Sequence, residues 1–63
     1  MKFKEFWKKG YYINRVTVDD IDGNRLYDGF GKRLKVSEFE EYEIEQFSIE
    51  RSTLMITVVK GEA

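Results

Sequence analysis

Hydrophobic and polar residues follow one another in short patterned segments, and the first segment predicts a helix. Within residues 1–10, Phe3, Phe6 and Trp7 are spaced so that a helix would place them on one face. Gly10 follows as a C-terminal stop. An extended edge strand is the alternative, but it would mix polar and apolar side chains on both faces. We therefore expect a helix, which is too short to persist unless its aromatic side chains dock on the rest of the protein.

The second segment predicts a β-hairpin, against which we expect the other elements to pack. Residues 11–19 (YYINRVTVD) are rich in β-branched side chains, and residues 25–30 form a second strand-like run. Between them, residues 20–24 (DIDGN) have the composition of a turn, in which Gly23 can adopt a positive φ. Glycines on both sides of Phe30 indicate a bulge or the end of the second strand.

A short helical turn is expected after this hairpin. Ser37 and Glu40 match a capping box, in which a serine N-cap is followed by a glutamate three residues later. We expect the turn to cover residues 38–42 and to direct Phe39 and Tyr42 toward the sheet.

The remaining segments predict a second hairpin. Residues 43–50 alternate only in part, because Ile44 is out of phase with Phe47 and Ile49, so an irregularity is expected near Gln46. A tight turn at residues 51–52 leads into residues 53–60 (TLMITVVK), which are apolar on both faces, as in a central strand or one that a partner covers.

Together the segments predict an α+β fold in one domain over residues 1–63. Its parts are a small antiparallel four-stranded sheet made of two β-hairpins, an N-terminal helix and a short helical turn between the hairpins.

Composition limits how such a fold is stabilised. A 63-residue chain buries only about 60% of its unfolded surface. It has no cysteine and no histidine, which removes disulfides, thiolate ligands and the commonest metal ligand and general base. The routes that remain are a dense aromatic core, for which 16% of the residues are available, and oligomerisation. We also expect a cytoplasmic protein, since there is no cysteine, no membrane-spanning apolar run and no signal-peptide core.

The charges are segregated along the chain although the net charge is only −1. Residues 1–35 carry nine Lys and Arg against five Asp and Glu, whereas residues 36–63 carry two against seven. Such segregation can favour self-association or attract a charged partner, and it also arises by chance in small domains.

Two motifs resemble ligand-binding loops but fail on spacing. If Gly23 is aligned with the invariant glycine of a calcium loop, Val18 takes the first ligand position and Gly29 the position of the bidentate glutamate. Residues 29–33 (GFGKR) contain glycine and lysine, but they lack the Walker spacing and the Ser or Thr that follows the lysine. We interpret the two segments as a turn and as a solvated basic turn.

No catalytic constellation is present in the sequence. The serines have no histidine to activate them. The glutamates of residues 38–45 alternate with apolar residues, as on the solvent-exposed face of an amphipathic segment. We therefore predict no enzyme, no cofactor, and no catalytic, cofactor-binding or metal-binding residue. An enzyme would require an arrangement of Asp, Glu, Tyr and Lys that the sequence does not reveal.

Lysines and aromatic residues are interleaved near the N-terminus, a combination that also occurs where proteins bind nucleic acid. Lysines contact phosphates, and exposed rings stack on unpaired bases. Burial of Phe3, Phe6 and Trp7 beneath the helix is the competing interpretation, and the acidic overall balance favours it. A helix lying on a membrane surface is disfavoured because its apolar face is only about two turns long. The candidate nucleic-acid-binding residues are Lys2, Lys4, Lys8, Lys9, Lys32, Arg33 and Lys35.

Three segments resemble small uncharacterised proteins encoded in phages and prophages of Gram-positive bacteria. They are residues 2–9 (KFKEFWKK), 16–29 (VTVDDIDGNRLYDG) and 44–58 (IEQFSIERSTLMITV). The resemblance implies an origin and no site residue. Our leading hypothesis is a small non-enzymatic protein-interaction module, whose partner is another protein or a second copy in a homodimer, with no membrane involved. The alternative hypothesis is a nucleic-acid-binding accessory protein that uses the basic residues named above.

Overall fold

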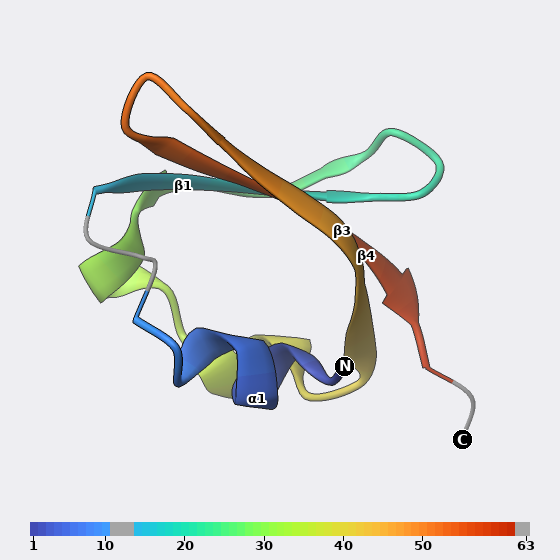
Figure 1. Cartoon of the computed structure of the whole chain (residues 1–63). Coiled ribbons are helices and arrows are strands. Elements are labelled where there is room, and N and C mark those ends of the chain that lie inside the picture. The colour runs from blue at the N-terminus through green and yellow to red at the C-terminus, as the bar shows by residue number, and fades with distance from the viewer. Residues whose placement is uncertain (11–13, 62–63) are drawn as a thin grey trace.

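A computed structural model describes residues 1–10 and 14–61, which form a small, largely β protein of the α+β class (Figure 1). Residues 11–13, with which the first predicted strand begins, lie outside the described residues. No helix in the described ranges is long and apolar enough to cross a membrane. The elements in chain order are α1 (Phe3–Trp7), β1 (Arg15–Asp20), β2 (Arg25–Phe30), the 3-10 helices η1 (Gly31–Arg33) and η2 (Val36–Phe39), β3 (Tyr42–Glu50) and β4 (Thr53–Lys60).

Helix α1 confirms the prediction for the N-terminal segment. Phe3, Phe6 and Trp7 are all buried on its inner face. The backbone N–H of Gly10 donates to the carbonyl oxygen of Trp7 at 3.2 Å, and Gly10 adopts a φ of +78°, which ends the helix. The alternative of an edge strand is therefore wrong for this segment, although Lys2, just before the helix, forms an isolated β-bridge with Glu43.

The four strands form one mixed sheet with the order β2-β1-β4-β3. Strands β1 and β2 pair antiparallel, as do β3 and β4. The two central strands, β1 and β4, pair parallel, with Val16 opposite Leu54 and Val18 opposite Ile56. The prediction of an entirely antiparallel sheet is therefore wrong.

The connection between β2 and β3 explains the parallel pair. Residues 31–41 include both 3-10 helices and run below the sheet, on the side where α1 lies (Figure 1). Strand β3 therefore starts from the same end of the sheet as β2 and runs in the same direction. Because β3 and β4 are antiparallel, β4 must then run parallel to β1.

Side chains of the two central strands, of α1 and of the connection beneath the sheet (Leu34 and Phe39) make up the core. Val16 and Val18 of β1 are fully buried, and Leu54, Ile56 and Val58 of β4 line the same face of the sheet. Since β4 lies between β1 and β3, the first of the two interpretations of residues 53–60, a central strand, is confirmed.

Aromatic rings join α1 to the connection beneath the sheet. The ring of Phe3 stacks on Trp7 at a centroid distance of 5.3 Å and on Phe39 of η2 at 4.8 Å. Phe39 is in turn tilted against Tyr42 at 5.9 Å.

The predicted capping box does not form. Helix η2 begins at Val36, its N-cap is Lys35, and no side chain caps it. Ser37 lies inside the 3-10 helix, and Tyr42 is the first residue of β3, where it pairs with Lys60. The helical turn predicted for residues 38–42 is therefore displaced toward the N-terminus, because strand pairing recruits Tyr42.

Both hairpins contain one irregularity. The register of β3 and β4 shifts between Ile44 and Gln46, as predicted. In β1 and β2 the shift lies between Val18 and Asp19, whereas β2 simply ends at Phe30, so the glycines beside Phe30 mark the end of the strand.

Candidate functional site

The basic residues proposed for nucleic-acid binding are exposed, but they come from two segments. Four of them belong to α1 and its flanks, and three to the connection that holds η1 and η2. The buried rings of Phe3, Phe6 and Trp7 offer no surface on which a base could stack. Burial is thus confirmed as the interpretation of these three aromatic residues, while Tyr11 and Tyr12 lie outside the described residues. The exposed basic residues are Lys2, Lys4, Lys8, Lys9, Lys32, Arg33 and Lys35.

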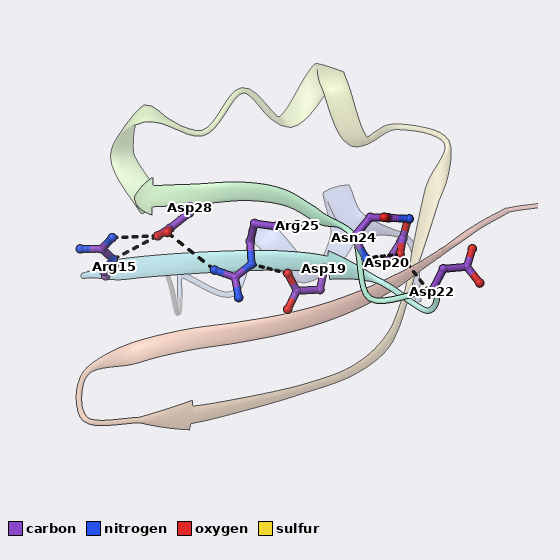
Figure 2. A network of polar contacts seen from close by, with 7 residues as sticks. All are labelled: Arg15, Asp19, Asp20, Asp22, Asn24, Arg25 and Asp28. Carbon is purple, nitrogen blue, oxygen red and sulfur yellow. Dashed lines mark hydrogen bonds and ion pairs between the residues drawn. The ribbon is translucent and has the colours of Figure 1, made fainter.

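The turn between β1 and β2 is organised by the carboxylate of Asp20 (Figure 2). Its Oδ1 accepts hydrogen bonds from the backbone N–H groups of Asp22 and Asn24, both at 2.9 Å, and its Oδ2 accepts one from Nδ2 of Asn24 at 3.0 Å. These bonds stabilise the charged form and therefore lower the pKa of Asp20. The side-chain amide of Asn24 contributes most, and the backbone N–H groups add to it. Gly23 adopts a φ of +89°. The motif is a turn, and no group of three or more acidic side chains among the described residues is placed to hold a metal ion.

An ion-pair network crosses β1 and β2 on the face of the sheet turned away from α1 (Figure 2). Asp28 pairs with Nη2 of Arg15 at 2.9 Å and with Nη1 of Arg25 at 3.6 Å, and Arg25 also pairs with Asp19. Both signs of charge are matched within the network, and its side chains are 31–58% exposed. We assign it to holding the two strands together, with the modest stabilisation that exposed pairs contribute.

A depression of about 510 Å³ lies where the ends of β3 and β4 meet the start of the chain. Its lining mixes lysine and glutamate side chains, of which Lys60 and Glu41 pair at 3.7 Å. Two lysines face three glutamates in this lining, and no three acidic side chains among the described residues are placed to hold a metal ion there. It is lined by Lys2, Glu40, Glu41, Tyr42, Glu43, Lys60 and Gly61.

Exposed apolar side chains gather on β3, which lies at one edge of the sheet. Phe47 is 47% exposed and Ile49 is 56% exposed, although both lie on the core-facing side, opposite the buried Ile56 and Leu54. Phe47 packs against Phe6 of α1 at a centroid distance of 4.7 Å. Among the described residues, α1 covers only part of Phe47, so about half of the Phe47 and Ile49 side chains remains accessible to solvent.

The outer edge of β3 differs between its two halves. In the first half, Lys2 bridges to Glu43, and the backbone N–H of Ile44 donates to the carbonyl oxygen of Met1 at 2.7 Å. No strand among residues 1–10 and 14–61 lies along the second half, residues 46–50. A second polypeptide can add a strand to an edge of this kind, with apolar pockets or side chains giving specificity. The tip of the β3–β4 hairpin, residues 46–55, is therefore the candidate functional site.

The pattern of residues 53–60 predicted either a central strand or one that a partner covers. Strand β4 is central and the protein's own core covers its inner face, whereas Met55 on its outer face is 40% exposed. For the hairpin tip, the spacing of Phe47 and Ile49 was the available signal of an apolar face. The exposure of that face follows only from the short length of α1 and from the position of β3 at the edge of the sheet.

Comparison of the chain with protein-family models, with curated proteins and with solved structures found no match in any of the three.

Proposed function

We propose that this protein is a small non-enzymatic interaction module that binds another protein chain through the tip of its β3–β4 hairpin. The observation that supports this best is the coincidence of exposed apolar side chains, Phe47 and Ile49, with a strand edge that no described strand covers. An extended segment of a partner would gain main-chain hydrogen bonds from the edge and apolar contacts from the side chains.

The proposal includes a cellular setting. Residues 2–9, 16–29 and 44–58 resemble phage and prophage proteins of Gram-positive bacteria, so we propose such an origin and a role in the bacterial cytoplasm. The absence of cysteine from the sequence agrees with a reducing compartment.

An affinity pull-down from a Gram-positive lysate tests the proposal when a pair of matched variants is included. Ile49→Arg places a charge on the hairpin tip. Ile21→Arg makes the same change in the turn between β1 and β2, where Ile21 is 59% exposed, close to the 56% of Ile49. We expect a partner protein that the wild type and Ile21→Arg retain and that Ile49→Arg loses. Equal capture by all three proteins would exclude the hairpin tip as the binding site.

Nuclease treatment of half of the lysate tests the alternative. The exposed basic residues named above support nucleic-acid binding by charge alone, without stacking from the buried rings. Capture that disappears with nuclease and weakens steeply with salt would overturn the protein-interaction proposal in favour of this alternative.

A further inference from the structure

We infer that one partner of the hairpin tip is a second copy of the same chain. In this dimer, β3 pairs antiparallel with β3 of the second copy about a twofold axis at Ser48, so that the two four-stranded sheets join into one. The inference deepens the proposed function, because it names an occupant for the proposed site.

The turn at residues 51–52 determines which backbone groups face the open edge. Arg51 and Ser52 have φ values of +48° and +66°, as in a two-residue turn of type I′, and Glu50 and Thr53 flank the turn as a pair. The flanking pair of such a hairpin is hydrogen-bonded, so Glu50 directs its N–H and C=O groups toward β4. Ile49, the residue before Glu50, then directs its own N–H and C=O groups toward the outer edge, because these groups alternate in direction along a strand.

A twofold axis at Ser48 matches the side chains of the two copies. Residues opposite one another in an antiparallel pair lie on the same face of the sheet. This register places Phe47 opposite Ile49 of the second copy, and the symmetry repeats the pair, so four exposed apolar side chains cover one another. On the other face, Gln46 lies opposite Glu50, where an amide can donate to a carboxylate.

The charges at the two ends of the paired segment also match. Glu45, at the register shift of β3, lies beside Arg51 of the second copy, the first residue of the β3–β4 turn, and this contact too occurs twice. Both residues are exposed in the single chain. Their pairing would link the acidic β3 to the basic residue of its own turn.

Neighbouring registers lack this complementarity. An axis at Phe47 places Glu45 opposite Ile49, an axis at Gln46 places Glu45 opposite Phe47, and an axis at Ile49 places Phe47 opposite Arg51. Each of these registers sets a charged side chain against an apolar one. The edge therefore favours one closed, symmetric dimer over unspecific strand addition.

Analytical ultracentrifugation of the whole chain tests the inference. We expect the mass to rise from 7.5 kDa toward twice that value as the concentration is raised from micromolar to about 1 mM. Glu45→Arg alone and Arg51→Glu alone should each weaken dimerisation about tenfold, because each creates two like-charge contacts. The double variant Glu45→Arg/Arg51→Glu should restore the dimer. Glu38→Arg, an equal change of charge on the exposed surface of η2, is the control and should leave it unchanged.

Ile49→Pro adds a test of the backbone. Proline removes the N–H that faces the outer edge but no N–H of the β3–β4 ladder, so the dimer should be lost and the fold kept, as circular dichroism would show. If this variant unfolds, the charge exchange still decides the question. A monomer at every concentration, or a dimer that the charge exchange does not affect, would overturn the inference. Capture of a different protein that is sensitive to Ile49→Arg would in that case leave the proposed function standing.

Discussion

Truncation of Phe3 to alanine tests directly the claim that aromatic docking holds this small fold together. Phe3 is 0% exposed and stacks on both Trp7 and Phe39, so it connects α1 to the chain beneath the sheet. Replacement of a buried phenylalanine by alanine costs about 3–5 kcal/mol. A domain of 63 residues has a total free energy of unfolding of about 3–9 kcal/mol, at roughly 0.05–0.15 kcal/mol per residue. We therefore expect Phe3→Ala to be largely unfolded at 25 °C, or to retain only a small part of its stability.

Because α1 has only five residues, we expect the cost of Phe3→Ala to lie near the upper end of its range, at about 5 kcal/mol. A helix this short does not persist in water without tertiary contacts, so loss of its anchor releases the whole segment and not one side chain alone. Phe3→Leu keeps an apolar side chain in the site and should cost about 1–2 kcal/mol, which leaves an unfolding transition that can be measured.

Urea unfolding is the appropriate assay. Trp7 is the single tryptophan of the sequence and contacts Phe3, so its fluorescence reports on the docking of α1, and far-UV circular dichroism reports on the sheet. Phe30→Ala is the matched control, because Phe30 is 62% exposed and its truncation should change the stability by no more than about 0.5 kcal/mol. The reasoning would be refuted if Phe3→Ala lay within about 1 kcal/mol of the wild type, or if both truncations had the same effect.

Two further predictions concern the turns. Asp20 has a lowered pKa in the folded protein, so its charge stabilises the fold above the unfolded pKa of about 3.9, and this contribution is lost as the pH falls through the folded value. The difference in urea midpoint between wild type and Asp20→Asn should therefore be largest above about pH 4 and shrink below it; a difference that is independent of pH would contradict the assigned cause. Ser52→Gly should raise the free energy of unfolding by about 0.5–1 kcal/mol, because Ser52 has a positive φ that glycine adopts without strain. Ser48→Gly, inside β3, is the control and should lower stability, and the second prediction fails if both glycine variants are destabilised.

Local patterns were sufficient to predict most elements and two of their details. The spacing of Phe3, Phe6 and Trp7 predicted both a helix and its buried face, because an amphipathic period depends only on neighbouring residues. The phase change at Ile44 likewise predicted the shift in register of β3. The absence of histidine and cysteine from the sequence ruled out disulfides, thiolate ligands and a histidine base or metal ligand in this chain before any geometry was considered.

Local signals failed where distant segments competed for the same residues. Ser37 and Glu40 form a valid capping box in isolation, yet pairing with β4 draws Tyr42 into β3 and moves the helical turn. Secondary-structure propensities differ by less than about 1 kcal/mol per residue, so strand pairing and core packing override them.

The sequence by itself predicted most of the elements and the apolar face of the helix, and its lack of histidine and cysteine rules out chemistry in this chain that needs an imidazole or a thiol. Only the tertiary structure decided that residues 31–41 return beneath the sheet, that β1 and β4 run parallel, and that β3 lies at an edge. The exposure of Phe47 and Ile49, on which the proposed function rests, is a consequence of these three facts together with the short length of α1. The physical reason is that the direction of a strand and its neighbours depend on the total apolar surface that the whole chain can bury, which no single segment encodes.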